Sequence, residues 1–113
     1  MEKRMKSIKI KKVRPGARIP HRATPGSAGL DLSACLDEPF TLAPGERALI
    51  PTGIAAELPD ENCAALIYAR SGLAVKHGVA LSNGVGVVDS DYRGELRVGL
   101  CNLSKEPYTI QPG

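Results

Sequence analysis

Residues 84–100 read GVGVVDSDYRGELRVGL, and this stretch decides the fold class. Its second part, residues 95–100, alternates along six positions, which is the pattern of a strand with one wet face. Residues 84–88 form a second strand candidate, and the polar segment between the two candidates ends both of them. The stretch therefore predicts short strands joined by tight connections.

The flanking sequence continues this pattern. The chain has 113 residues, enough for one domain, and it contains 12 Gly and 9 Pro. Further strand candidates are residues 7–11, 30–36, 40–42, 47–51, 53–58, 63–69, 79–81 and 108–110. The 63–69 run is almost continuously apolar, so we expect a buried strand there. Many short strands at close spacing predict an all-β sandwich or jelly roll.

One short helical turn and one long loop interrupt the strands. Residues 71–76 suit a helical turn that has Ser71 as its N-cap and Gly78 as its end. Residues 14–29 are rich in Pro, Gly, Arg and Ser and are expected to form a loop.

The charge distribution argues against a nucleic-acid-binding domain. The net charge is +3, but residues 1–18 hold eight Lys or Arg and one acid, so the rest of the chain is net negative. A nucleic-acid surface needs basic charge over the body of the domain. We expect this basic segment to be a solvated first strand. No apolar run approaches the roughly 18 residues of a membrane-spanning helix, so no membrane contact is expected.

The cysteines indicate a reducing compartment. Cys35, Cys63 and Cys101 are odd in number, form no CxxC pair and lie in apolar stretches. We expect small buried thiols. Because the basic N-terminus lacks the apolar core of a secretory signal, the expected location is the cytoplasm.

Three segments carry residues whose chemistry fits together: 28–32 (AGLDL), 70–73 (RSGL) and 83–95 (NGVGVVDSDYRGE). Arg70 and Ser71, at a helix start, suit an anion. Asp89 follows an apolar pair, where a carboxylate can orient a water and take its proton. Each segment taken alone also fits a structural role, namely an Asx-turn at Asp89, an Asn-Gly turn at Asn83 and an N-cap at Ser71.

In this order and spacing, the three segments resemble the first three of the five motifs of the trimeric dUTPases. The resemblance runs from about Ile8 onward, with Ala69 where that family usually has Pro. It implies a distorted jelly roll, a homotrimer with active sites at the subunit interfaces, and Mg²⁺-dependent hydrolysis of dUTP to dUMP and pyrophosphate.

The resemblance also implies a role for each site residue. Asp89 would be the general base for the water that attacks the α-phosphorus, and Asp31 an outer-shell residue that reaches Mg²⁺ through water. Tyr92 would lie beneath the sugar and exclude a 2′-hydroxyl. The residues expected to bind the substrate are Arg70, Ser71, Gly72, Asn83, Gly86, Val88 and Tyr92. Asp91 is expected to hold the turn or to pair with Arg93.

Two other functions stay open on the sequence. A dCTP deaminase of the same fold needs a glutamate near the base, and Glu95 is the candidate, although the Asp-x-Asp-Tyr pattern fits the pyrophosphatase better. The second open function is that of a non-catalytic protein, which would use the same scaffold to bind a partner.

The fourth and fifth motifs of the family would come after Gly113. We therefore expect residues 1–113 to be a single dUTPase-like domain that is incomplete at its C-terminal end. Because the missing arm would close over the nucleotide and exclude water, turnover is expected to be reduced.

Overall fold

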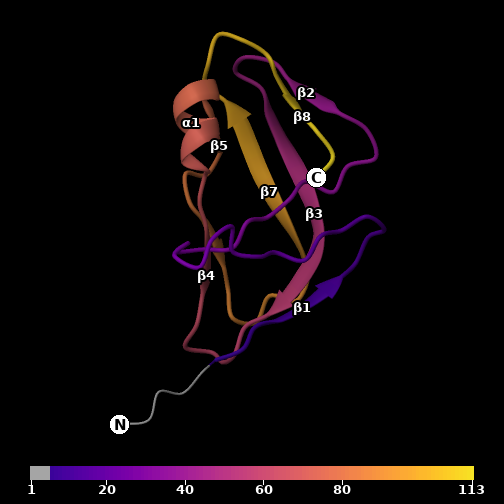
Figure 1. Cartoon of the computed structure of the whole chain (residues 1–113), viewed down its shortest axis with the longest axis vertical. Helices are drawn as coiled ribbons and strands as arrows, with labels where there is room; N and C mark the ends of the chain where they lie inside the picture. The colour runs from indigo at the N-terminus through magenta and orange to yellow at the C-terminus, as the bar shows by residue number, and fades with distance from the viewer. Residues whose placement is uncertain (1–5) are drawn as a thin grey trace.

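Short strands and one short helix make up the protein in the computed structural model, which describes residues 6–113 (Figure 1). The elements are β1 (Lys9–Lys12), β2 (Phe40–Leu42), β3 (Arg47–Glu57), β4 (Ala65–Ile67), α1 (Ser71–His77), β5 (Val79–Leu81), β6 (Gly86–Val88), β7 (Glu95–Asn102) and β8 (Tyr108–Ile110). The all-β prediction with one helical turn is confirmed. In the described part of the chain, no helix has the length and apolar character to cross a membrane.

The strands form three antiparallel groups. Four strands make the main sheet in the order β1-β3-β7-β5, while β2 pairs with β8 and β4 pairs with β6. Figure 1 shows the long strands β3 and β7 side by side, with α1 beside β5 near the end of β7. The β4–β6 ribbon adjoins the last two sequence motifs, because Arg70 comes three residues after β4 and residues 83–95 include β6.

A bulge divides β3 where the sequence predicted two separate strands. The pairing of β3 with β7 shifts register between Pro51 and Ala55. Pro51 has no N–H to donate, and Gly53 has a φ of 73°, so a regular ladder cannot run through this point. Side chains replace the missing ladder bonds, because the Thr52 hydroxyl donates to the Leu96 carbonyl and the Gly53 N–H donates to Glu95 at 3.0 Å.

Two of the predicted strands differ from the structure. Residues 30–36 form no strand and make only isolated backbone hydrogen bonds to their neighbours. Asp31 bridges to His21, and the Cys35 N–H donates to the Pro51 carbonyl at 2.8 Å. Pro51 has no N–H to return a bond, so no ladder forms between it and Cys35. The predicted buried strand at 63–69 is also wrong, since β4 has three residues and Leu66 is 51% exposed. β4 pairs only with β6, so one face of this ribbon stays open.

The helix confirms one predicted cap and corrects the other. Gly78 ends α1 in a left-handed conformation (φ 67°), and its N–H reaches the carbonyls of Leu73 and Ala74. The N-cap is Arg70 and not Ser71, and it makes no side-chain cap bond. Ser71 is already the first helical residue, so its hydroxyl does not cap the helix.

The core is small and lies mainly on the main sheet. Leu42, Ile54 and Val79 are almost fully buried. The buried Asn102 amide donates to the carbonyls of Leu42 and Glu106 at 2.9 and 2.8 Å. The three cysteines are free thiols, but all are half-buried and not buried as predicted, because the segments that carry them lie at the margin of this core.

Candidate active site

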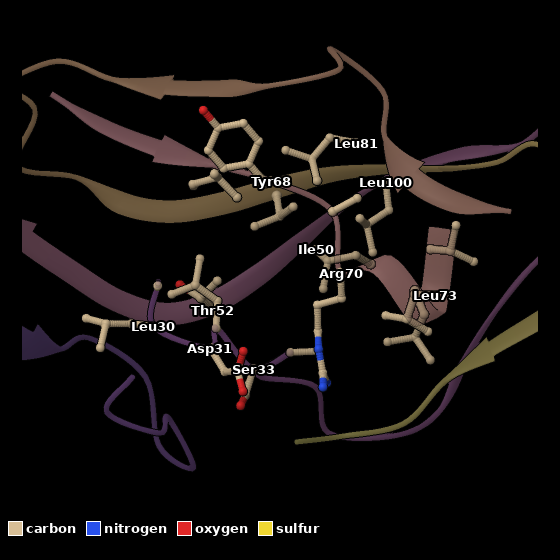
Figure 2. Close-up of a pocket in the computed structure, with 18 of the residues that line it drawn as sticks. Leu30, Asp31, Ser33, Ile50, Thr52, Tyr68, Arg70, Leu73, Leu81 and Leu100 are labelled. Carbon is tan, nitrogen blue, oxygen red and sulfur yellow. The ribbon is translucent and has the colours of Figure 1, made fainter. Parts of the chain in front are cut away.

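A hollow beside β4 brings together residues of the first two motifs. It has a volume of about 630 Å³, and Asp31, Tyr68, Arg70 and the inner faces of β3, β5 and β7 line it. Figure 2 shows the Asp31 carboxylate and the Arg70 guanidinium at the same margin of this hollow. The ion pairs within residues 6–113 involve other side chains, so the two opposite charges share a space without pairing.

Arg70 also lines a second hollow of about 670 Å³, which continues along α1. Ser71 and Gly72 line it too, together with Lys76 and His77. Arg70 and Ser71, which the sequence suggests for an anion, and Gly72, expected to bind the substrate, thus line one hollow. Among the described residues, no carboxylate lines this second hollow, so its electrostatic character suits an anion.

The turn that joins β5 to β6 holds Asn83, and Gly86 begins β6; both are expected to contact the base. Gly84 donates its N–H to the Leu81 carbonyl at 3.0 Å, and the Val85 N–H donates to the Asn83 carbonyl at 2.9 Å. Asn83 is therefore part of a tight turn and leaves its side chain exposed. At Gly86 a Cβ would stand 3.3 Å from the Ile67 Cβ, so glycine allows β6 to approach β4 closely.

Asp89 is exposed and lies directly after β6. Its backbone carbonyl accepts the Tyr92 N–H at 3.1 Å, and no hydrogen bond to its carboxylate occurs within residues 6–113. The side chain therefore does not close an Asx-turn. This leaves its carboxylate oxygens available to a water molecule.

The same loop contains Asp91 and Tyr92. Asp91 does not pair with Arg93, because the Arg93 guanidinium donates instead to the carbonyls of Ser90 and Tyr92 at 2.7 and 3.3 Å. Tyr92 is 46% exposed and is not part of the core. Its hydroxyl donates to the Glu95 carbonyl at 2.8 Å, which holds one end of the ring against the start of β7.

Glu95 has a structural role that the sequence did not indicate. Its carboxylate accepts hydrogen bonds from Arg14, from Arg97 and from the Gly53 N–H, and its side chain is only 10% exposed. The bond from Arg14 is the largest cause that lowers the pKa of Glu95 to about 2, while burial acts in the opposite direction. The strand pattern puts Glu95 and Arg97 on one face of β7, but nothing in the sequence indicates Arg14.

The β4–β6 ribbon separates Asp89 from Arg70. Val88 pairs with Ala65 at one end, and Asp89 follows Val88. Arg70 follows the other end of β4, where Ile67 pairs with Gly86, and Asn83 precedes Gly86 at that same end. A strand rises about 3.3 Å per residue, so the two ends of this three-residue ribbon are roughly 7 Å apart. Neither hollow is lined by Asn83, Asp89 or Tyr92.

A metal ion would find little support from protein groups alone. Residues 6–113 contain no cluster of three or more His, Cys, Asp or Glu side chains that could hold one. Asp31 is the one carboxylate among the residues that line the hollow beside Arg70. Mg²⁺ is commonly bound by one or two carboxylates, several waters and substrate phosphates. The single carboxylate of Asp31 therefore fits an ion that is held mainly by a nucleotide.

Comparison with known proteins identifies the relatives of this chain. Residues 16–113 match the family model described as dUTPase. A deoxyuridine 5′-triphosphate nucleotidohydrolase from Thiobacillus denitrificans is 53% identical over 105 residues, which cover 93% of this chain and 72% of the relative. One from Desulfitobacterium hafniense is 50% identical over 113 residues, with 96% of this chain and 75% of the relative covered.

Solved structures show the same fold. The dUTPase from phage phi11 of S. aureus matches with a TM-score of 0.81 and 22% identity, covering 95% of this chain and 83% of that one. A mutant of that phage enzyme, described as showing the coordination of a structural Mg(II) ion, matches with a TM-score of 0.80 and 22% identity over 95% of this chain and 84% of that one. The jelly-roll prediction is thereby confirmed.

Proposed function

Because the chain belongs to the dUTPase family, we propose that it hydrolyses dUTP to dUMP and pyrophosphate by attack of water on the α-phosphorus. The observation that carries this proposal is the state of Asp89. Its carboxylate is exposed at the end of β6 and accepts no hydrogen bond from the described residues. Such a group can orient a water molecule and take its proton as the water attacks.

The turn before β6 and the loop after it would hold the nucleoside. Asn83 offers a side-chain amide, and Gly86 and Val88 offer backbone groups next to a strand that approaches closely at Gly86. Backbone donors and acceptors at a fixed strand end can match the edge of a uracil. Tyr92 would lie against the sugar, with its hydroxyl held by the Glu95 carbonyl.

The phosphates would lie at Arg70. A guanidinium donates two parallel hydrogen bonds to phosphate oxygens, and the Ser71 hydroxyl and Gly72 line the adjoining hollow. Asp31 would hold a Mg²⁺ ion through water. When bound, that ion neutralises charge on the phosphate oxygens.

The separation of Asp89 from Arg70 supports a homotrimer whose active sites lie between subunits. An Asp89 base and an Arg70 phosphate ligand must act on the same triphosphate, but within one chain they follow opposite ends of the β4–β6 ribbon, and Asp89 lines neither hollow beside Arg70. A second copy could supply Asp89 and Tyr92 beside the Arg70 of the first. Each site would then combine Asp31, Arg70 and Ser71 of one chain with Asp89 and Tyr92 of another.

The deaminase alternative is not favoured. A deaminase needs a carboxyl group that exchanges a proton near the base, whereas three donors hold the Glu95 carboxylate. A cytoplasmic location stays a proposal, and the three free thiols support it.

Hydrolysis of dUTP tests the proposed function directly. The protein is incubated with Mg²⁺ and dUTP, UTP or dCTP, and dUMP, pyrophosphate and ammonia are followed. We expect dUMP and pyrophosphate from dUTP, much slower hydrolysis of UTP and no ammonia. Ammonia from dCTP would establish a deaminase, and absence of both turnover and dUTP binding would refute an enzyme function.

A further inference from the structure

We propose that Glu95 is a positioning residue that fixes the ring of Tyr92, and thereby sets the preference of the site for deoxyribose over ribose. This inference rests on the proposed function, in which Tyr92 lies against the sugar. Neither the family match nor the sequence motifs assign such a role to Glu95.

Glu95 is anchored by three separate parts of the chain. Arg14 comes from the segment after β1 and donates to both carboxylate oxygens, at 3.0 Å through Nη2 and 2.5 Å through Nε. The Gly53 N–H donates from the β3 bulge at 3.0 Å, and Arg97 donates from β7 itself at 2.9 Å. A side chain held by three donors and only 10% exposed has little freedom to move. The Glu95 backbone is held in the main sheet as well, where Glu95 pairs with Ala55 at the start of β7.

The Tyr92 ring is attached to this anchor. Its hydroxyl donates to the Glu95 carbonyl at 2.8 Å, across the intervening Arg93 and Gly94. The contact is close, since a Cβ added to Gly94 would stand 2.6 Å from the Tyr92 hydroxyl oxygen. Glycine at position 94 therefore permits the ring to fold back onto the start of β7.

Little else holds the ring in place. Tyr92 is 46% exposed, so packing does not fix it. The other hydrogen bonds of this loop are internal: the Tyr92 N–H donates to the Asp89 carbonyl, and Arg93 donates to the Ser90 and Tyr92 carbonyls. The Glu95 carbonyl that holds the Tyr92 hydroxyl is thus positioned in two ways: by the pairing of Glu95 with Ala55, and by the bonds that the Glu95 carboxylate accepts from Arg14, Arg97 and Gly53.

A fixed ring matters because dUTP and UTP differ by only one hydroxyl group. A flexible apolar pocket rejects an added hydroxyl weakly, and typical discrimination by such pockets is about 10²-fold. If the ring is free to turn, a ribose 2′-hydroxyl gains room. Loss of the Glu95 anchor should therefore admit UTP while changing dUTP turnover much less.

The test compares dUTP with UTP in three variants and a control. Glu95→Gln keeps the shape and weakens the anchor, Gly94→Ala pushes the ring away without changing charge, and Tyr92→Phe removes only the hydroxyl. Glu38→Gln, an exposed site outside the described ion pairs, is the control for loss of one negative charge. For each protein we measure kcat/KM for both nucleotides, and Kd for non-hydrolysable analogues of both.

We expect the dUTP-to-UTP preference to fall about tenfold in each of the three variants and to stay unchanged in Glu38→Gln. The double variant Glu95→Gln/Tyr92→Phe should lose no more than the larger single effect, because both changes break the same link. Unfolding curves identify any variant that does not fold, and the Gly94→Ala protein keeps the test valid if Glu95→Gln is unstable.

An unchanged preference in folded Gly94→Ala and Glu95→Gln proteins would overturn the inference. An equal loss for both nucleotides would do the same, since it would make Glu95 a residue that only stabilises the fold. These outcomes differ from failure of the proposed function, in which the wild-type protein itself neither hydrolyses dUTP nor binds its analogue.

Discussion

Asp89 and Glu95 stand at the two ends of one loop, and their carboxylates have opposite surroundings. Asp89 is exposed and its side chain accepts no hydrogen bond within residues 6–113, whereas Glu95 accepts bonds from two arginines and a backbone N–H. A proton acceptor in catalysis must be able to gain and lose a proton at working pH. The pKa of Glu95, lowered to about 2 chiefly by Arg14, makes that carboxylate a fixed negative charge.

The first prediction concerns Asp89. In the Asp89→Asn protein, kcat for dUTP should fall about 10²–10⁴-fold, because the amide cannot take the proton of the attacking water. The KM should change little, and the thermal midpoint should stay at the wild-type value. The matched control is Asp91→Asn, which changes the next acid in the loop and should keep activity near wild type. Equal losses in the two variants would contradict the assignment of the base to Asp89.

The second prediction concerns pH. The pKa of Glu95 is about 2 in the folded protein against an ordinary 4.5, so its ion pairs stabilise the fold fully above pH 4.5, and this contribution disappears as pH falls toward 2. Because Arg14 and Arg97 are half exposed, the contribution should be on the order of 1 kcal/mol. Urea unfolding should show Glu95→Gln to be less stable than wild type at pH 6, with the gap closing by about pH 2–3. A gap independent of pH would refute this account.

At the level of elements, the bulge in β3 connects the main sheet to the end of the loop between β6 and β7. The bulge turns the Gly53 N–H toward the Glu95 carboxylate, and the Gly53 carbonyl accepts the Val13 N–H at 2.7 Å. One residue thus ties the end of β1, the bulge and the start of β7 together. A Cβ at this position would stand 2.7 Å from the Ala17 Cβ and 2.9 Å from the Cys35 sulfur.

The third prediction follows from this crowding. Gly53→Ala should lower the free energy of unfolding by about 3 kcal/mol or more, from the positive φ together with the overpacked contacts. Gly45→Ala is the control, because Gly45 has a similar φ of 79° but open space around it, and should cost about 1 kcal/mol. Chemical denaturation of both variants gives the comparison. Similar losses would mean that the contacts around Gly53 relax easily.

Much of the secondary structure was predictable from the sequence. The strands at 40–42, 79–81 and 108–110 and the helix end at Gly78 agree with the local signals, because alternation and glycine conformation are local properties. The failures depend on distant partners. Within residues 30–36, Cys35 donates to the Pro51 carbonyl, and Pro51 has no N–H to return the bond. The hydrogen bonding of Glu95 depends on Arg14, which is 81 residues away in sequence.

For the whole molecule, the sequence proposed the candidate site residues but not their arrangement. Local sequence signals and the family resemblance proposed Arg70 and Asp89, and their roles stay predictions. That these two residues follow opposite ends of the β4–β6 ribbon comes from strand pairing, Val88 with Ala65 and Gly86 with Ile67. No local pattern in the sequence specifies that register. The separation is the physical reason for proposing active sites that lie between chains.

The measurement that tests this account most directly mixes two inactive proteins, Arg70→Ala and Asp89→Asn. Each lacks one group of the site, and mass measurement verifies that subunits exchange. If sites form between chains, about a quarter of the sites in an equal mixture combine two intact groups, and dUTP hydrolysis should return to about a quarter of the wild-type rate. A mixture that exchanges subunits and stays inactive would contradict the account, because each chain would then have to build its site alone.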